Sequence, residues 1–361
     1  MSVKGRKSVV RRASPRPREA VFQTPRGVAE KVATAFGEVD PGAKIITNSA
    51  RGTYATCRRL YWLQYRQLLA QRGVKHYFFV GGAYHKELET MYLERRFDVA
   101  ACRRRIEAAT KEALNRAATS DQTEKIVAGA AVAMGMAEGY ASLYLKTDLQ
   151  RMEFPELERP FGPIPIHGTE WSYAGVRDGL IRWAQDDDRY DARRGDLALA
   201  EHKSTAQMDA NYFARLPVDN QILGYLWSMR QEGGEQPKSV LYNVGQKSRL
   251  RQKKGEGRGQ FLDRVVADYK ENPSKYFYRE KVIFSPKVLD SFEASLRETV
   301  RELEWCIENG NWSMNDRACT TRGMCEMFPL CSTQFKDKDM FLLYERKERA
   351  HQEVDIDFDE D

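Results

Sequence analysis

Two neighbouring apolar segments that carry acidic side chains constrain the fold of this chain more than any other feature. Residues 176–184 and 196–201 alternate apolar and polar side chains, as half-buried strands do. The first segment contains Asp178, the second ends at Glu201, and Lys203 follows two residues later. Side chains two residues apart in a strand point to the same face. The pattern therefore predicts a sheet with carboxylates and a lysine at one place.

Carboxylates on adjacent strands, with a lysine beside them, have the chemistry needed to bind a divalent metal next to a phosphate. Such a metal activates water and stabilises charge, and a lysine assists by electrostatics or by orienting the water. We predict Asp178 and Glu201 as metal ligands and Lys203 as the assisting group. The side chain of His202 points the other way, but its backbone carbonyl is a further candidate ligand. A solvated strand face is the alternative for the Glu-x-Lys pair alone.

Two pairs of residues at helical spacing add to this candidate site. Gln221 and Tyr225 are four residues apart, so they share a helix face and are expected to contact a strand or to order the lysine. His85 and Glu89 have the same spacing in a second predicted helix. An imidazole beside a carboxylate suits Mn²⁺.

The remaining pattern predicts an α/β protein whose first half is mainly helical. Four prolines exclude a helix in residues 155–165 and are followed by three antiparallel strands. The predicted helices are 54–70, 84–92, 99–117, 122–148, 212–231 and 286–309, with a turn at 78–82; the predicted strands are 166–173, 176–184, 196–201, 239–244 and 276–284. The order suggests an α/β core with a helical insertion at about 99–150.

Charge and hydropathy set the expected limits of the domain. We predict a disordered basic leader (1–44), one domain (45–335) and a C-terminal segment (336–361) with an acidic tail. No run of about 18 apolar residues and no apolar secretory signal is recognised, so neither a membrane nor secretion is expected. A basic loop at 247–259 contributes Lys247, Arg249, Arg251, Lys253 and Lys254 as candidate phosphate contacts.

Three of the six cysteines lie close together near the C-terminus, within a closing segment at 306–331. Cys319, Cys325 and Cys331 are each separated by five residues, and Cys57 is the best candidate for a fourth ligand. Four thiolates suit an iron–sulfur cluster or a structural zinc, which would join the N-terminal helix to the C-terminal end. Cys102 and Cys306 lie in helical patterns and are interpreted as packing residues, although either could be the fourth ligand. Core or free thiols are the alternative for all of them.

The motifs in this order resemble the RecB-like branch of the PD-(D/E)xK nuclease superfamily. The resemblance is to members with four cysteines around an iron–sulfur cluster, such as the AddB nuclease domain, CRISPR adaptation nucleases and phage or bacterial exonucleases. It covers residues 49–331 and depends on Cys57, Gly-x-x-x-His at His85, Gly-x-x-Asp at Asp178, Glu201-x-Lys203, Gln221-x-x-x-Tyr225 and the three later cysteines.

This resemblance implies a restriction-endonuclease-like core, in which a central mixed sheet is flanked by helices. It implies that Mg²⁺ or Mn²⁺ is bound by His85, Asp178, Glu201 and the His202 carbonyl, with Lys203 catalytic. Gln221, Tyr225 and Glu89 would position DNA. The four cysteines would hold a [4Fe–4S] cluster, but their spacing differs from the x2 and x5 of many relatives, which leaves iron or zinc open.

The expected function is a metal-dependent DNA nuclease, acting as an exonuclease on single strands or duplex ends in repair, recombination or phage DNA processing. Its expected place is the cytoplasm of a bacterial or phage-infected cell, at the nucleoid, with recombination or replication proteins as partners. The alternative is a non-catalytic iron–sulfur DNA-binding module of a recombination complex. Intact Asp178, Glu201 and Lys203 count against that alternative. No Gly-x-x-x-x-Gly-Lys-Ser/Thr loop is present, so no helicase motor is expected.

Overall fold

The computed structural model describes residues 31–32, 42, 44–321 and 323–351. The predicted acidic tail and nearly all of the predicted basic leader lie outside the described residues.

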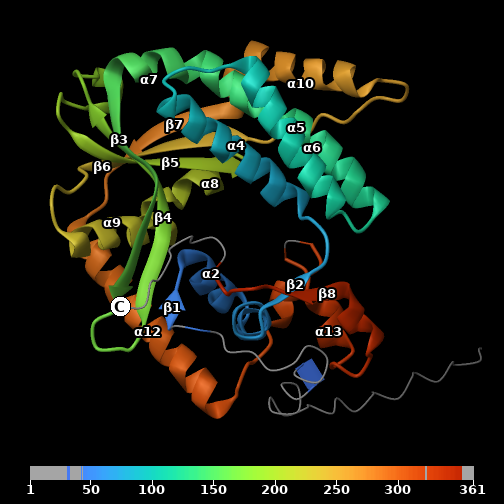
Figure 1. Cartoon of the computed structure of the whole chain (residues 1–361). Coiled ribbons are helices and arrows are strands. Elements are labelled where there is room, and N and C mark those ends of the chain that lie inside the picture. The colour runs from blue at the N-terminus through green and yellow to red at the C-terminus, as the bar shows by residue number, and fades with distance from the viewer. Residues whose placement is uncertain (1–30, 33–41, 43, 322, 352–361) are drawn as a thin grey trace, which may run out of the picture.

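Six strands form one mixed sheet at the centre of the protein (Figure 1). Their order is β1, β4, β5, β6, β7, and β3 pairs with β4. The β1–β4 and β5–β6 pairs are parallel and the other pairs are antiparallel. The strands are β1 (Ile45–Ile46), β3 (Met152–Pro165), β4 (Ser172–Trp183), β5 (Leu197–Thr205), β6 (Ser239–Gln246) and β7 (Phe277–Val282). The predicted α/β class, a central mixed sheet flanked by helices, is confirmed.

The helices of the predicted insertion cover one face of the sheet, together with two helices from outside it (Figure 1). They are α4 (His76–Leu93), α5 (Val99–Asn115), α6 (Ser120–Tyr140), α7 (Lys146–Arg151) and α10 (Arg258–Glu271), with α11 (Pro273–Tyr276) leading into β7. A π-helical turn, Ala141–Leu145, joins α6 to α7. The stretch Ser120–Arg151 is long and apolar enough to cross a membrane, but 67% of its apolar window is buried inside the protein. It is packed as a core helix against α4, α5 and α10.

Helices α8 (Ala210–Ala214), α9 (Asn220–Glu232) and α12 (Pro286–Asn309) lie on the other side of the sheet (Figure 1). The side chains of strand β5 show how the sheet separates the apolar cores on its two faces. Leu197 and Leu199 pack in the core with α9 and α12, whereas Ala198 and Ala200 belong to a separate cluster. This is the alternation expected of a strand with both faces covered.

The two ends of the described chain form a third unit, which we call the closing lobe (residues 48–71 and 312–351). It contains α2 (Asn48–Thr56), α3 (Arg58–Tyr61), a π-helical turn (Trp62–Arg66), β2 (Leu69–Gln71), α13 (Phe328–Ser332) and β8 (Tyr344–Arg346). Strands β2 and β8 pair in antiparallel fashion. The predicted boundary at residue 335 thus lies before a strand that pairs with residues 69–71.

Two predictions for the N-terminal half were wrong because tertiary contacts override local pattern. The helix predicted at 54–70 is broken at Cys57, whose backbone is extended, since residues 313–315 bind the chain there: Arg59 N donates to Ser313 O, and Asn315 Nδ2 donates to Thr56 O. The turn predicted at 78–82 is part of α4. Gly81 lies close to β5 rather than in a turn, because a Cβ there would lie 3.1 Å from the Ser204 hydroxyl.

Two predictions for the sheet region were also wrong in their boundaries. The first strand of the antiparallel series is residues 152–165, not 166–173. Its prolines are tolerated because β3 pairs only with β4 among the described strands, so it lies at an edge. The helix predicted at 212–231 is divided into α8, a 3₁₀ turn (Leu216–Val218) and α9, because Pro217 cannot continue a helix.

A buried arginine joins the helical layer to the sheet. The Arg279 guanidinium on β7 forms two hydrogen bonds of 2.6 and 2.8 Å with the Asp148 carboxylate on α7 and a third of 2.9 Å with the Tyr140 hydroxyl. The side chains of Asp148 and Arg279 are 1% and 4% exposed. Removal of one partner from such a pair leaves an uncompensated buried charge.

We predict that Asp148→Ala lowers the free energy of unfolding by about 3–5 kcal/mol, because the Arg279 guanidinium loses its only carboxylate partner among the described residues. Urea denaturation followed by circular dichroism measures this. Asp121→Ala, which removes the exposed ion pair with Lys125, is the matched control and should cost less than about 0.5 kcal/mol. Equal losses in the two variants would contradict the prediction.

Candidate functional site

The candidate site lies where strands β4 and β5 separate. Their ladder ends at the pair Gly179 and Ala200, so Asp178 and Glu201 would form the next pair. Instead, the Asp178 carboxylate accepts a hydrogen bond of 2.7 Å from the backbone N–H of His202. A side chain thus takes the place of a strand partner, and both carboxylates remain available to a ligand at the point of separation.

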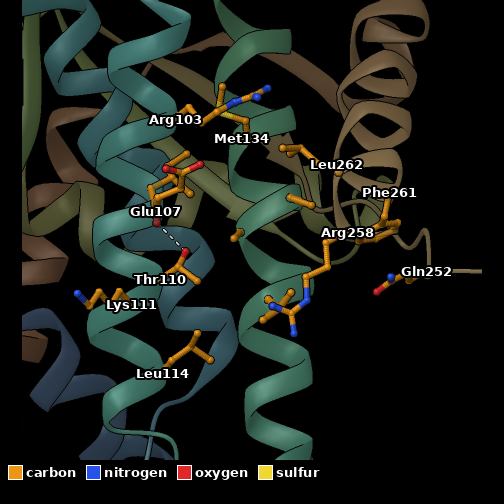
Figure 2. A pocket seen from close by; sticks show the side chains of 15 residues that line it. Arg103, Glu107, Thr110, Lys111, Leu114, Met134, Gln252, Arg258, Phe261 and Leu262 are labelled. Carbon is orange, nitrogen blue, oxygen red and sulfur yellow. Dashed lines mark hydrogen bonds between the residues drawn. The ribbon is translucent and has the colours of Figure 1, made fainter. Parts of the chain in front are cut away.

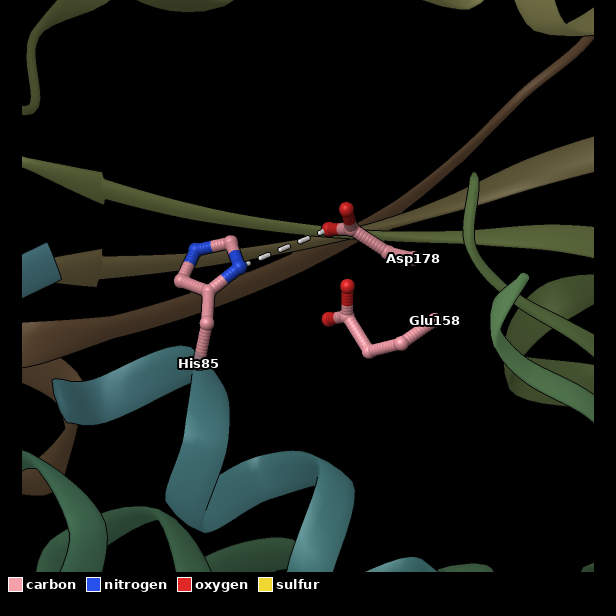
Figure 3. A group of neighbouring side chains, drawn as sticks. All are labelled: His85, Glu158 and Asp178. Atoms are coloured by element: carbon pink, nitrogen blue, oxygen red, sulfur yellow. Dashed lines mark ion pairs between the residues drawn. The ribbon is translucent and has the colours of Figure 1, made fainter. Parts of the chain in front are cut away.

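Three side chains from three elements meet at this point: His85 from α4, Glu158 from β3 and Asp178 from β4 (Figure 3). Each offers a ligand atom within 4.8 Å of the other two. His85 Nδ1 is 3.9 Å from Asp178 Oδ2. The structure therefore brings together the predicted ligands His85 and Asp178.

Glu158 was missed by sequence reasoning. It lies in the proline-rich strand β3, where the residues on either side pair with Gly179 and Arg177, so it faces Asp178 across the ladder. Its φ of 43° is in the left-handed region, which residues with side chains rarely adopt. Only the register of the two strands identifies Glu158, and the pattern of its own segment carries no signal for it.

The predicted lysine lies at the centre of a second cluster on the α9 side. Lys203 Nζ is 2.6 Å from Glu201 Oε1 and 3.6 Å from Asp219 Oδ2. It donates a hydrogen bond of 2.5 Å to Gln221 Oε1, and Gln221 Nε2 donates one of 2.7 Å to the Tyr225 hydroxyl. Gln221 therefore contacts the predicted lysine directly, and Tyr225 contacts Gln221.

Asp219 is the second residue that sequence reasoning missed. It caps α9, since its side chain accepts a hydrogen bond of 2.9 Å from Gln221 N. The Asp-Asn pair before an apolar helical pattern was a usable signal for a helix start. Its contact with Lys203 depends on how α9 packs against β5 and was not predictable from that signal.

The acidic groups perturb one another strongly. Burial, then the nearby charges of Asp178 and Glu89, raise the pKa of Glu158 to about 8. Burial and the charge of Asp178 also raise the pKa of Glu201 well above its usual range. Burial alone would lower the pKa of Lys203, but the carboxylates of Glu201 and Asp219 raise it, so the lysine stays charged. Burial lowers the pKa of His85 and keeps its imidazole neutral, as a metal ligand requires.

The residues present fit a divalent cation. Glu201 Oε2 is buried and has no hydrogen-bond partner within the described ranges, which is costly for a carboxylate oxygen. A neutral imidazole with several carboxylates is a donor set for Mg²⁺ or Mn²⁺. A cation there would offset the excess of negative charge that Lys203 alone leaves. Glu201 is turned toward Lys203 and does not belong to the group of His85, Glu158 and Asp178. It therefore lies beside the three candidate metal-ligating side chains rather than among them.

His202 lies on the opposite face of β5, as alternation predicts. Its ring packs against the rings of Tyr92 and Tyr140 in the helical layer, at centroid distances of 6.1 and 5.8 Å. Burial lowers its pKa well below the usual range. The only part of His202 that is predicted to bind the metal is its backbone carbonyl.

The other predicted DNA contacts separate into two groups. Glu89 lies on α4 one turn beyond His85 and pairs with Lys86 at 2.6 Å. Lys247 Nζ donates to the backbone oxygen of Tyr77 at 2.9 Å, and Arg249 Nη2 donates to that of Ala206 at 3.1 Å, so both lie near the start of α4 and the end of β5. Further along the basic loop, the exposed residues Arg251, Lys253 and Lys254 lead toward α10.

A separate groove of about 530 Å³ lies at that far end, between α5, α6 and the start of α10 (Figure 2). Ile106, Met134 and Phe261 form apolar parts of its lining, with Arg103 and Arg258 among the charged ones. No residue predicted for the metal centre lines it.

The four predicted cluster ligands come together in the closing lobe. Cys57 lies at the break between α2 and α3, and its sulfur accepts a hydrogen bond of 3.4 Å from Asn315 N. Cys325 N donates to Cys319 O at 2.8 Å. Burial and the charges of the other three cysteines, opposed by Arg59, raise the pKa of the Cys331 thiol to about 12. Cys102 and Cys306 lie elsewhere, beside Met134 and Tyr54.

A family model for the PD-(D/E)XK nuclease superfamily matches residues 46–332. This range contains every predicted site residue and most of the sequence. The chain belongs to the PD-(D/E)XK nuclease superfamily. The comparison with curated proteins gave no match. Nucleases of this superfamily use divalent metals and act on DNA, and the mixed sheet flanked by helices is consistent with their restriction-endonuclease-like fold.

If Glu158 binds the divalent metal used by this superfamily, its raised pKa should make metal binding depend on pH. A metal ligand must be ionised, so below pH 8 a bound cation has to displace the Glu158 proton. We predict that Mn²⁺ affinity falls as the pH is lowered from about 8.5 to 6.5. In Glu158→Gln this pH dependence should be shallower, because about one proton fewer is released for each Mn²⁺ bound. Isothermal titration calorimetry in two buffers measures affinity and proton release.

The control for this prediction is Glu153→Gln, which changes an exposed carboxylate on the same strand. It should retain the affinity and the proton release of the unmodified protein. If Glu158→Gln releases as many protons on binding Mn²⁺ as the unmodified protein does, Glu158 is not a ligand.

Proposed function

We propose that this chain is a Mg²⁺- or Mn²⁺-dependent deoxyribonuclease that acts as an exonuclease on single-stranded DNA or duplex ends. The observation that carries the proposal is the charged lysine, Lys203, held by Glu201, Asp219 and Gln221 beside a centre of buried carboxylates. The order of motifs typical of RecB-like nucleases supports the exonuclease mode. Repair, recombination or phage DNA processing is the proposed setting.

The residues of the chain have separate tasks in this proposal. His85, Glu158, Asp178 and Glu201 hold the cation, which when bound activates water and stabilises charge on the phosphate. Lys203 keeps its proton because two carboxylates face it, so it acts as a fixed positive charge at the scissile phosphate or as a donor that orients the water. Gln221 fixes the direction of the ammonium group, and Tyr225 fixes Gln221.

We predict that Lys203→Ala lowers the rate of DNA cleavage by at least about 100-fold, because a preorganised charge at the phosphate is lost. Metal binding and the unfolding midpoint should change little. The assay uses single- and double-stranded DNA labelled at each end, and circular DNA, over a series of metals. Lys238→Ala, which removes an exposed lysine paired with Asp196, is the matched control.

Full activity of Lys203→Ala would contradict the proposed function. Cleavage of circular DNA at the rate of linear DNA would contradict the exonuclease mode while leaving the metal-dependent nuclease in place. DNA binding by the unmodified protein without cleavage in any metal would favour a non-catalytic DNA-binding module.

We also propose that Cys57, Cys319, Cys325 and Cys331 hold a [4Fe–4S] cluster, which suits a reducing cytoplasm. A tetrahedral zinc with Zn–S bonds of about 2.3 Å would bring its sulfurs to about 3.8 Å from one another. In the described part of the chain no three cysteine sulfurs lie within 4.8 Å of one another, which is wider than a tetrahedral zinc site requires.

Protein purified without oxygen is therefore expected to be brown, with absorbance near 400 nm and about four irons and four sulfides per chain. Cys331→Ser should lose this absorbance and destabilise the closing lobe. Cys102→Ser, in the insertion, should retain it, because the Cys102 sulfur lies beside Met134. One zinc and no sulfide per chain would contradict the cluster.

A further inference from the structure

Two adjacent aromatic side chains at the start of α4 are exposed to solvent. Tyr77 is 47% and Phe78 is 65% exposed. Their ring centroids are 4.6 Å apart, so the two rings support each other. Aromatic side chains contribute large apolar area, and exposed apolar surface beside a groove is a feature of binding sites.

Helix geometry places Phe78 in line with the metal centre. Phe78 and His85 are seven residues apart, which puts them on the same helix face and about 10 Å apart along the axis. Gly82 lies between them on this face and is exposed. Apart from its chain neighbours and its own helix backbone, no atom of the described residues lies within 4 Å of the position where its Cβ would be. The helix surface between Phe78 and the candidate metal ligand is therefore open.

The surroundings of the aromatic pair are mixed in charge, with lysines directly beside it. Tyr77 and Phe78 line a groove of about 820 Å³ between α4 and the closing lobe. Its charged lining residues are Lys75, Arg116, Lys347, Glu326 and Glu345. Lys75 Nζ is 5.5 Å from the centroid of the Phe78 ring and 2.5 Å from Glu326 Oε2. Lys247, at the start of the basic loop, binds the backbone oxygen of Tyr77.

We propose that Phe78, supported by Tyr77, stacks on an unpaired base of the DNA strand whose phosphate lies at the metal centre. This proposal rests on the proposed nuclease function and adds that the strand is single-stranded near the scissile phosphate. A base inside a duplex has both faces covered by its neighbours, so away from a duplex end only an unpaired base offers a face to an exposed ring. At about 3.4 Å per stacked nucleotide, the 10 Å between Phe78 and His85 corresponds to about three nucleotides.

The test is a double-mutant cycle between the ring and the base. In a Lys203→Ala background, which prevents turnover, fluorescence anisotropy measures the binding of single-stranded DNA in which one abasic position is moved along the strand. Phe78→Ala should weaken binding by about 5-fold or more, as expected for one base stacked on an aromatic ring. An abasic nucleotide at one position should weaken binding by a similar factor, and the two changes together should cost no more than either alone.

Matched variants separate stacking from packing. Phe78→Tyr keeps a ring and should bind like the parent, whereas Phe78→Leu keeps apolar volume and should bind like Phe78→Ala. Trp305→Ala removes an aromatic side chain that is 49% exposed on α12 and does not line the groove, so it should have no effect. Circular dichroism checks that each variant is folded.

The outcomes distinguish this proposal from the proposed function. Cleavage by the unmodified protein, with unchanged binding in Phe78→Ala, overturns the stacking role and leaves the proposed nuclease function in place. Coupling between Phe78 and one abasic position supports stacking even if no metal gives cleavage. The proposal is overturned if the fold-losses of affinity from Phe78→Ala and from the abasic nucleotide multiply at every position. It is also overturned if the Lys203→Ala protein binds no single-stranded DNA.

Discussion

The excess of buried negative charge at the separation of β4 and β5 is the constraint on which the rest of the structure depends. Burial and the nearby charge of Asp178 raise the pKa of both Glu158 and Glu201. Lys203 is the lysine that the described chain places against Glu201. Glu201 Oε2 has no hydrogen-bond partner among the described residues. Such a buried carboxylate oxygen is costly unless a further positive charge lies beside it.

Elements from both faces of the sheet reach this point, and each contributes a different part. Helix α4 brings His85 from one side, and it approaches β5 closely because Gly81 has no side chain to meet Ser204. Helix α9 brings Gln221 from the other side, beyond its cap at Asp219. The buried pair of Arg279 and Asp148 fixes the helical layer on the sheet and so limits how far the two sets of groups can move apart.

The sequence allowed prediction of those parts of the site that depend on local spacing. Asp178, Glu201 and Lys203 followed from strand alternation, Gln221 and Tyr225 from helical spacing, and the bounds of α12 from its apolar stripe between Pro286 and Gly310. Glu158 was not predictable, because its place opposite Asp178 arises only when β3 pairs in one register. The break at Cys57 likewise depends on a contact with Asn315, which is distant in the sequence.

The closing lobe constrains the order in which the parts of the protein fold during synthesis. Strand β2, at residues 69–71, finds its partner only at residues 344–346, and Cys57 meets its neighbouring thiols only at residues 319–331. A ribosome releases the N-terminal residues long before these partners, so the lobe that contains the start of the described chain is completed last. The sheet and helical layers can assemble first, and the groove beside Phe78 exists only once the end of the chain has folded back against its beginning.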